Sequence, residues 1–497
     1  MKKILKKLAL SISVFLLMQS IFAQYEVDAL RFSETDWQGS ARFMGAGRAF
    51  GAVGAEFSAL NLNPASIGLY KKSEVSFTPM TISAYKNVSD YNGTETPAQK
   101  VRYSLNSAGI VLALPGISSS LWKKFQIGYG YNRVNNYNTV FSIKGRSLGS
   151  TIGDNFADEA TKQKLNYKNY KNWSSDDLYF GWIFCLIDTI SGSETSYLSP
   201  LSGLNLKQSS SVVRSGGNDE MVFTFGTNYD DKLYLGATLG VPFIHFNENR
   251  TYTETNVEPD AILQSFKMTD ELSVRATGIN LKLGVNYQPF NFLRVGAAFH
   301  TPTYYGIVKE TYDRIFYAVI SGNEVIPKPE EYFKYPGKFK YSLTTPLRAM
   351  VNMAFFIAKQ AFISAEYEIT DYSMANMYAV DYNFDDNEED NENQIIQLMY
   401  GACHTARIGA EMNLSPVFAI RAGYNYTSSP FKNKINDGSK HYASAGFGFR
   451  TKHFYGDFAY ALTISKEKYW MYDAQFVNAV NNKFITHRIM MSMGVRF

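Results

Sequence analysis

The sequence lacks long hydrophobic runs. After an apolar stretch near its start, no segment of about 18 apolar residues follows, so we expect no transmembrane helix. Yet 45% of its 497 residues are hydrophobic and 15% are aromatic. This hydrophobicity must lie either in the core of a very large soluble β-protein or in a β-barrel, whose strands hide it in alternation.

Cysteines, excess charge and catalytic motifs are scarce too. Cys185 and Cys403 are the only cysteines, too few for a disulfide framework in an exported chain. The net charge of +4 is small for this length, so we expect no nucleic-acid partner. The six histidines show no HExxH spacing or metal-ligand pattern, and the chain has no nucleophile elbow. We therefore expect no metal, no cofactor and no enzyme, a barrel hydrolase with an isolated Ser and His being the alternative.

The first 23 residues have the pattern of a secretory signal peptide. Four lysines among the first seven residues precede the apolar core LALSISVFLLM, and Ala23 is a small residue suited to cleavage. The residue directly after Ala23 is Gln24 and not a cysteine, so we expect no lipid anchor. The mature chain is expected to be exported.

Strict alternation of apolar and polar residues dominates the rest of the chain. In TARIGAEMNL, the even positions 406 to 412 are apolar, and the odd positions carry Arg407, Gly409 and Glu411. Arg294 and Arg421 lie on the equivalent minority face of two other segments. A soluble β-sandwich also alternates, but its interior is dry, whereas a barrel lumen can hold charged groups in water.

Segment lengths favour a transmembrane barrel over a sandwich. Tight connections such as Asp230-Asp231 and Pro289-Phe290 alternate with long polar ones, including an insertion between about 138 and 218. Outer-membrane barrels have short turns on one side, long loops on the other and an even number of strands. The chain also ends in Phe497 on an amphipathic strand, which resembles the assembly signal of bacterial outer-membrane proteins. The 14 predicted strands cover roughly 73–86, 101–113, 124–137, 219–229, 232–250, 268–288, 291–311, 338–356, 360–371, 402–413, 417–427, 440–451, 453–464 and 485–497.

A compact segment, GAVGAEFSALNLNPASIGLY, precedes the first predicted strand. A barrel of about 14 strands has a lumen too wide for wall side chains to fill, and the small residues here would allow close packing inside it. The longer stretch GAGRAFGAVGAEFSALNLNPASIGLY resembles the N-terminal hatch of the FadL/OmpP1/TodX family, outer-membrane transporters of long-chain fatty acids and other hydrophobic compounds. Two further stretches, GINLKLGVNYQPFNFLRVGAAFHTPT and HTARIGAEMNLSPVFAIRAGYNYTSSP, are similar to hairpins of that family.

The resemblance implies an all-β fold, a 14-stranded antiparallel barrel with the hatch in its lumen. The implied organisation is a signal peptide at 1–23, a lead-in and hatch at 24–72, and the barrel at 73–497. The implied partners are a hydrophobic small molecule, outer-membrane lipid and the outer-membrane insertion machinery, with the protein as a monomer. The hatch residues carried over from the resemblance are Gly51, Gly54, Asn63, Pro64 and Ala65.

The resemblance also implies capture of an amphiphile among the extracellular loops, gating by the hatch, and lateral exit through a break in the barrel wall. Gly128 and Gly130 are candidates for that break, since glycine in a strand often marks a kink; the alternative is ordinary lumen-facing glycines. A purely structural hatch is the alternative to gating.

Two sets of residues are candidates for ligand binding. The first is an apolar patch in the longest loop, for which the alternative is packing of a loop helix onto the barrel rim. The second is a set of lumen arginines that could bind a carboxylate head group, for which the alternative is pairing with groups such as Glu411. The candidate residues are Leu178, Phe180, Trp182 and Phe184 in the loop, and Arg294, Arg407 and Arg421 in the lumen.

A second function remains open, that of a FadL-related shuttle or scaffold protein of a secretion system at the cell surface. The acidic segment YNFDDNEEDNENQ, about 382 to 394, could be a docking surface in such a protein, although a solvated loop is the alternative. A transporter needs a continuous apolar pocket above the hatch, whereas a shuttle needs only a rigid rim.

Overall fold

The structure is a computed structural model, and it describes most of the chain. The predicted signal peptide at 1–23 lies outside the described part. The described residues are 25–116, 120–257, 263–320, 324–326, 335–358, 360–380, 386–434 and 436–497.

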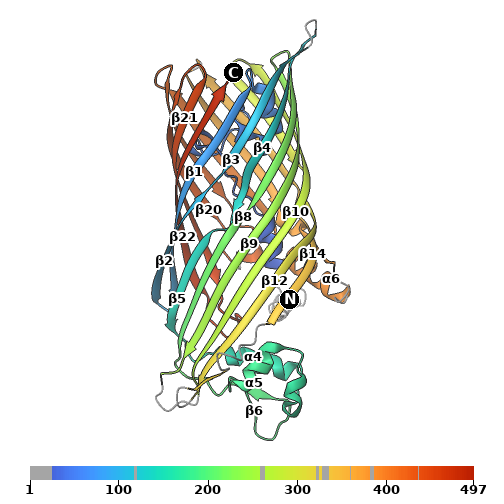
Figure 1. The fold of residues 1–497 in the computed structure, drawn as a ribbon, viewed down its shortest axis with the longest axis vertical. Coiled ribbons are helices and arrows are strands. Elements are labelled where there is room, and N and C mark those ends of the chain that lie inside the picture. The colour runs from blue at the N-terminus through green and yellow to red at the C-terminus, as the bar shows by residue number, and fades with distance from the viewer. Residues whose placement is uncertain are drawn as a thin grey trace, which may run out of the picture.

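The chain forms a closed antiparallel β-barrel of 14 wall strands (Figure 1), as the alternation predicts. The ring closes where the first wall strand pairs with the last one, with Ser83 opposite Arg488. Nine wall strands are continuous: β1 (Glu74–Tyr91), β8 (Lys207–Tyr229), β9 (Leu233–Thr255), β10 (Leu263–Phe290), β18 (Ala402–Asn413), β19 (Phe418–Thr427), β20 (Lys440–Arg450), β21 (Phe454–Tyr469) and β22 (Val480–Arg496).

The other five wall strands each consist of two segments in sequence. A short additional strand, β13 (Glu324–Ile326), pairs with the end of β12. The two-segment strands are β2 (Thr94–Ser104) with β3 (Ser107–Pro115), β4 (Trp122–Asn136) with β5 (Thr139–Arg146), β11 (Leu293–His300) with β12 (Tyr304–Ile320), β14 (Tyr335–Thr344) with β15 (Arg348–Ile357), and β16 (Ala361–Asp371) with β17 (Asn376–Ala379).

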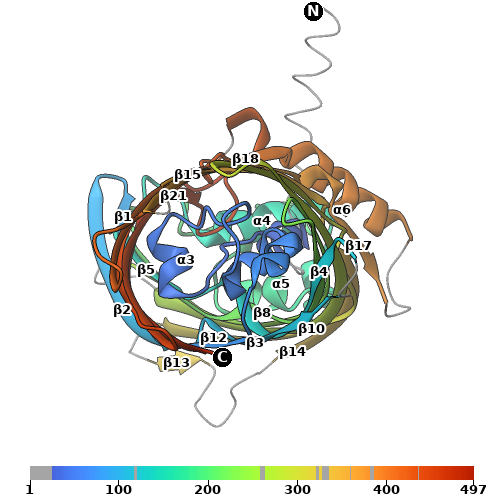
Figure 2. The same ribbon diagram turned by 90° about the horizontal axis from the view of Figure 1, so that it is seen from above.

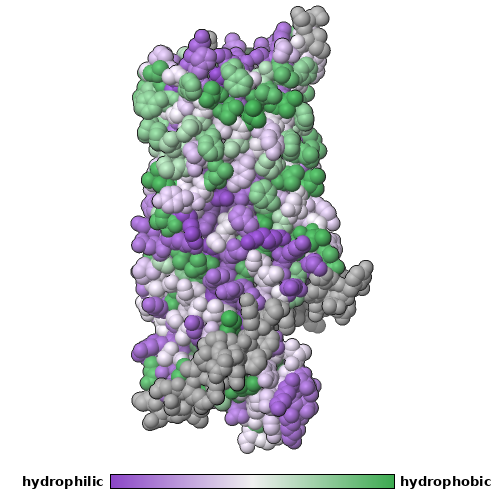
Figure 3. Space-filling model, in the orientation of Figure 1, coloured by the Kyte–Doolittle hydropathy of each residue, from purple (hydrophilic) through white to green (hydrophobic). Residues whose placement is uncertain are grey.

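Each of the 14 predicted strands is present, and many extend further toward the long loops. β10 shows the physical reason: near the short turn its outward side chains are apolar, as at Ile279 and Leu281, but farther along they are Lys267 and Glu271. The outer part of the wall therefore stands in water beyond the lipid, where the sequence no longer needs an apolar face. Figure 3 shows the corresponding green band near the short-turn end and a more hydrophilic surface beyond it.

The two ends of the barrel differ as predicted. The C-terminus and the short turns lie at one end, and the long insertion forms a small module at the other (Figure 1). Its elements are α4 (Ile152–Lys162), η3 (Tyr167–Asn172), α5 (Asp176–Ile183), β6 (Asp188–Thr189) and β7 (Tyr197–Leu198). No helix among the described residues is long and apolar enough to cross a membrane.

The acidic segment at about 382 to 394 is not a loop throughout. From Asp386 it belongs to α6 (Asp386–Met399), on the outside of the barrel (Figures 1 and 2). Ile395, Ile396 and Met399 of this helix are buried, so burial of an apolar edge gives a charged segment a helical structure.

The N-terminal part of the chain fills the lumen. Figure 2, a view along the barrel axis, shows it inside the ring of strands. We call residues 24–39 the lead-in and residues 40–70 the hatch. The lead-in contains α2 (Tyr25–Ser33); the hatch contains α3 (Ala41–Gly45), η1 (Phe57–Asn61) and η2 (Pro64–Leu69).

Glu159 is a carboxyl group of the loop module that lies in an unfavourable environment. Burial, with a smaller contribution from the nearby Asp177 carboxylate, raises the pKa of Glu159 on α4 to about 7. A pKa that is higher in the folded state means that the folded module binds this proton more tightly than the unfolded chain does. Protonated Glu159 therefore stabilises the module at low pH, and this stability is lost as the pH rises from about 4.5 through 7.

We expect hydrogen exchange in α4 to become faster between pH 5 and pH 8, after correction for the intrinsic rate. The substitution Glu159→Gln should remove most of this change, because the amide cannot ionise. Glu194→Gln is the matched control, since Glu194 is exposed on the same module and pairs with Lys168. An unchanged pH profile in Glu159→Gln would show that another group is responsible.

Candidate functional site

The hatch folds through two helix caps that its sequence provides. Ser40 caps α3 by accepting a hydrogen bond from the Phe43 N–H. Asn63 caps η2, where its Oδ1 accepts from the Ala65 N–H at 3.0 Å, and Pro64 stands at the first helical position. Asparagine is a favoured cap, and proline at the first position loses no hydrogen bond. The Asn-Pro-Ala sequence is therefore a helix start.

The same asparagine attaches the hatch to the wall. Its Nδ2 lies 3.2 Å from Asn286 Oδ1 and 3.3 Å from the Val285 carbonyl oxygen, both on β10. Asn286 in turn donates to the Gly51 carbonyl at 2.9 Å. Asn63, Asn286 and Gly51 are buried, and Val285 is half-buried. The polar chain satisfies groups that would otherwise be costly inside the barrel.

Hatch and wall meet backbone to backbone at several wall glycines. A Cβ atom at Gly284 would lie 2.1 Å from Asn63 Oδ1, and one at Gly409 would lie 2.1 Å from the Ala46 carbonyl oxygen. A Cβ at Gly423 would lie 2.1 Å from the Gly47 nitrogen. The glycines on the minority face of the alternating strands therefore make room for the hatch.

Gly51 and Gly54, the two predicted hatch glycines, also stand at positions where a larger side chain would not fit. A Cβ at Gly51 would lie 2.6 Å from Asn352 Nδ2, and the Gly51 N–H donates to the Glu366 carboxylate. Gly54 has φ +67°, a left-handed conformation that favours glycine, and a Cβ there would overlap Leu69.

The three predicted arginines face the lumen, and each is engaged by the protein. Arg294 donates to the carbonyl oxygens of Ala52 and Val53 in the hatch, both at 2.8 Å. Arg407 pairs with Glu368 at 2.5 Å.

Arg421 lies 2.6 Å from Glu411 and 2.7 Å from Asp457. Arg42 of the hatch binds the same Glu411 through two hydrogen bonds of 2.8 and 2.9 Å. Arg294 and Arg42 thus fasten the hatch to the wall, whereas Arg407 and Arg421 pair with carboxylates of the wall itself. Binding of a ligand carboxylate by the three predicted arginines stays a prediction.

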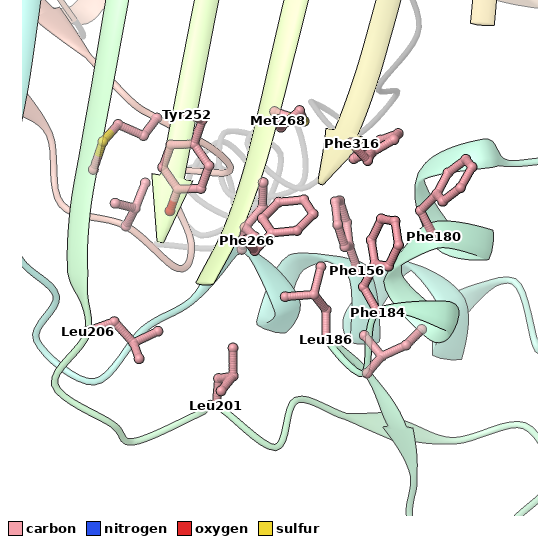
Figure 4. Packing of buried hydrophobic residues seen from close by; sticks show 14 of the residues in the cluster. Phe156, Phe180, Phe184, Leu186, Leu201, Leu206, Tyr252, Phe266, Met268 and Phe316 are labelled. Atoms are coloured by element: carbon pink, nitrogen blue, oxygen red, sulfur yellow. The ribbon is translucent and has the colours of Figure 1, made fainter. Parts of the chain in front are cut away.

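The apolar loop patch lies on and just after α5 and packs onto the barrel rim (Figure 4). Phe180 stacks on Phe316 of β12 with 4.9 Å between ring centroids, and Phe184 lies 6.3 Å from Phe266 of β10. Leu178 is buried with them, whereas Trp182 is half-buried. The four residues are thus part of the module's core, and their role in ligand capture stays a prediction.

The wall has one interruption that the sequence does not reveal. β3 pairs with β4 only from Ser107, opposite Asn132, to Pro115. Beyond this point β2 pairs with β1 and β5 pairs with β8, but no ladder is present between β2 and β5 in the described residues. We call this place the seam. It leaves one edge of β4 beyond Asn132 without a neighbouring strand.

The interpretation of Gly128 and Gly130 as the wall break is wrong. Both residues are paired on both sides, with β3 and with β8. They are lumen-facing glycines that adjoin the hatch, because added Cβ atoms would meet Ile67 and Phe57. The β3–β4 ladder is interrupted instead after Asn132, where two adjacent wall strands change partner.

The lead-in covers the freed edge of β4. The Asp36 N–H donates to the Val134 carbonyl at 2.9 Å, and the Gln38 N–H donates to the Arg133 carbonyl at 3.0 Å. The Asn135 side chain donates to the Glu34 carbonyl, also at 2.9 Å. Main-chain hydrogen bonds that a neighbouring strand would make are thus made by the lead-in.

Charges hold the lead-in in this position. The Asp36 carboxylate pairs with Arg48 of the hatch at 2.5 Å and with Arg488 of β22 at 3.1 Å. Arg348 donates to the Ser33 carbonyl and to Thr35 Oγ1, the latter at 2.9 Å. The part of the lead-in that covers the seam is therefore linked to the hatch through the Asp36–Arg48 ion pair.

On the long-loop side of the seam, α2 fills an apolar part of the lumen. The ring centroid of Phe32 lies 5.9 Å from those of both Tyr137 and Phe246. Ala29 and Leu30 are buried in the same cluster. Two lumen cavities beside Thr35 and Trp37 are small, and their linings are largely polar. The α2 helix of the chain itself thus occupies apolar space in the lumen.

Sequence reasoning missed the seam, its cover and the occupant of the apolar space. The signals were weak: alternation lapses at Leu105-Asn106 and at Tyr137-Asn138, and the lead-in carries Leu30 and Phe32 within a polar stretch. Among the residues that the structure describes, no group of His, Cys, Asp and Glu side chains is arranged to hold a metal ion.

Comparisons with known proteins identify this architecture. A FadL homologue of Pseudomonas aeruginosa superposes with a TM-score of 0.53 at 13% identity, covering 93% of this chain and 99% of that one. The chain has the FadL fold. The toluene transporter TodX of P. putida superposes with a TM-score of 0.52 at 12% identity, with the same coverage. No protein-family model and no curated protein match the sequence. The fold implied by the resemblance of the hatch sequence is confirmed. At these identities the likeness to FadL proteins extends to the fold alone.

We expect Gly284→Ala to loosen the hatch of this FadL-type barrel, because the added methyl group overlaps Asn63. Overpacking of this kind costs about 1–3 kcal/mol. Permeability of reconstituted vesicles to small hydrophilic solutes should rise as the hatch leaves its position. Gly456→Ala is the control, since the nearest atom to a Cβ there, the Ser492 carbonyl oxygen, lies 3.9 Å away. Equal permeability in the two variants would show that this contact does not hold the hatch.

Proposed function

We propose that this protein is a passive outer-membrane transporter of hydrophobic compounds, from which the compound leaves sideways through the seam. The observation that carries the proposal is the seam itself, a place in an otherwise closed wall where the lead-in replaces a strand. A seam covered by a movable segment can open without breaking wall ladders. The fold of a FadL homologue and of a toluene transporter supports this reading.

Lateral exit suits a hydrophobic compound on physical grounds. Each buried methylene group favours an apolar environment by about 0.8 kcal/mol. A route along the barrel axis would expose the compound to water at the periplasmic end. A route through the wall would deliver it directly into the bilayer.

The lead-in gives the transporter a gate that a ligand can operate. Phe32 and its apolar neighbours on α2 occupy the space that an apolar ligand would need. A ligand that displaces α2 would pull on Glu34 and Asp36, which lie directly after it and hold the seam cover. Asp36 would pass the movement to the hatch through Arg48. Capture would begin at the rim near α5, and Arg407 could receive a head group once its pairing with Glu368 is exchanged.

A cross-link across the seam tests the exit route. Trp37 and Val134 belong to one buried apolar cluster, so the pair Trp37→Cys and Val134→Cys, with Cys185 and Cys403 replaced by Ser, should accept a disulfide or a short bifunctional reagent. We expect cells carrying the oxidised pair to lose uptake of labelled toluene and oleate, and reduction to restore it.

The single variant Trp37→Cys in the same background is the control for loss of the tryptophan itself. Undiminished uptake through a fully cross-linked protein would show that exit does not require the lead-in to leave the seam.

A second variant tests the role of α2. Phe32→Ala should weaken the binding of α2 in the lumen, because removal of a buried phenylalanine side chain costs about 3–5 kcal/mol. Mass spectrometry of the gently extracted protein should then find more of a co-purifying hydrophobe than in the unchanged protein. Phe290→Ala, at an exposed position near a short turn, is the control. Absence of any bound hydrophobe, together with a stoichiometric protein partner, would favour the secretion-shuttle function.

A further inference from the structure

The outer face of the barrel carries a repeated pair of side chains. On three strand pairs, β16/β18, β19/β20 and β21/β22, an outward tyrosine hydroxyl meets the Nδ1 atom of a histidine on the neighbouring strand. In each pair, one residue lies directly opposite the tyrosine, and the histidine comes two positions before that residue in the sequence. The pairs are Tyr367–His404, Tyr424–His441 and Tyr460–His487, at 2.6, 2.7 and 2.7 Å.

These pairs mark the outer boundary of the apolar band. On β22, Val495, Met493 and Ile489 are exposed and apolar, and His487 lies ten residues before the terminal Phe497. At about 3.3 Å per residue and a tilt of about 40°, ten residues rise roughly 25 Å. This is the height of the lipid-facing band of such barrels. Tyrosine and histidine have the amphipathic character that suits the lipid boundary.

Directly beyond this boundary four lysines gather on β1, β21 and β22. Lys466 lies opposite Lys483 in the β21–β22 ladder, and Lys468 is the next outward residue on β21. On β1, Val88 lies opposite Lys483, and Lys86 is the preceding outward residue, two positions earlier. All four side chains are exposed.

No salt bridge joins the four lysines to a carboxylate among the described residues, and the nearest acidic side chain on this face, Asp90, lies beyond the cluster on β1. Like charges directly opposite in an antiparallel ladder are destabilising. Such an arrangement is favourable where an external anion is shared between the two charges.

The position of the cluster identifies that anion. Lys483 lies four residues beyond His487, roughly 10 Å above the apolar band by the same rise and tilt, which is the depth of lipid head groups. Between the Tyr460–His487 pair and the facing lysines, Ile464 lies opposite Ile485, an apolar pair that the upper part of an acyl chain can contact. Basic residues at a membrane boundary attract anionic head groups, and lysine binds phosphate as a point charge.

We infer that Lys86, Lys466, Lys468 and Lys483 form a binding site for a phosphorylated lipid of the outer leaflet, with its acyl chains on the apolar pair below. The Nε2 atom of His487, which the contact with Tyr460 leaves free, lies on the same strand as Lys483 and borders the site. The site is on the outer wall and does not depend on what passes through the lumen.

Native mass spectrometry of the detergent-solubilised barrel tests this inference. The probes are a bis-phosphorylated hexa-acyl lipid A, the same lipid without its phosphates, and inorganic phosphate. We expect one tightly bound bis-phosphorylated lipid for each barrel. Lys466→Gln with Lys483→Gln should weaken binding about 30-fold, which corresponds to about 1 kcal/mol for each lysine. The dephosphorylated lipid should give no discrete adduct.

Lys123→Gln with Lys452→Gln is the charge-matched control, because both lysines are exposed at the short-turn end of the barrel. This variant should bind the lipid as the unchanged protein does. Gel mobility with and without heating would verify that each variant is folded. Equal binding by the Lys466/Lys483 variant would overturn the inference. So would release of the lipid by inorganic phosphate at an equal concentration, which would indicate a site for an ion only.

Discussion

The width of the lumen is the constraint on which the rest of this structure depends. Wall side chains cannot fill a cylinder of 14 strands, so a separate piece of chain must do so and must be attached at many points. Close approach comes from glycines such as Gly284 and Gly409, where hatch backbone and wall backbone touch. Attachment comes from Asn63, Arg294 and Arg42, which bind across the same interface.

The seam adds a second demand to the N-terminal segment. A sheet edge left unpaired inside a membrane is costly, because backbone groups find no water there. The lead-in meets this demand with hydrogen bonds from Asp36 and Gln38 to β4, and its helix fills the apolar space above. One continuous stretch of chain therefore closes the lumen, the wall and the apolar chamber. Such a stretch can couple the three, since movement of one part must displace its neighbours.

The sequence predicts the wall far better than the contents of the lumen. Alternation in TARIGAEMNL placed a strand at 402–413 and turned Arg407 inward, because a period of two leaves no other choice when one face meets lipid. Asn63-Pro64-Ala65 located the hatch through a resemblance whose physical basis is a helix cap. These features depend on local chemistry that a short stretch of sequence contains.

The seam and the ion pairs depend instead on register. Nothing in β2 or β5 alone states that the two strands do not pair, and nothing in Arg421 states that Asp457 will lie 2.7 Å away. The apolar patch around Phe180 was visible, but its partner Phe316 comes from a strand more than a hundred residues later. Alternation defines the two faces of each strand and leaves their neighbours undetermined.

The closure of the ring between β1 and β22 has a consequence for how the protein is made. The hatch precedes β1 in the chain, and its Ala41 N–H donates to Ser492 Oγ on β22, at 2.6 Å. A folded hatch cannot be threaded into a cylinder that is already closed. The last strand must therefore join the first one around a hatch that is at least partly in place, so that order of assembly, and not only final stability, is encoded in this N-terminal segment.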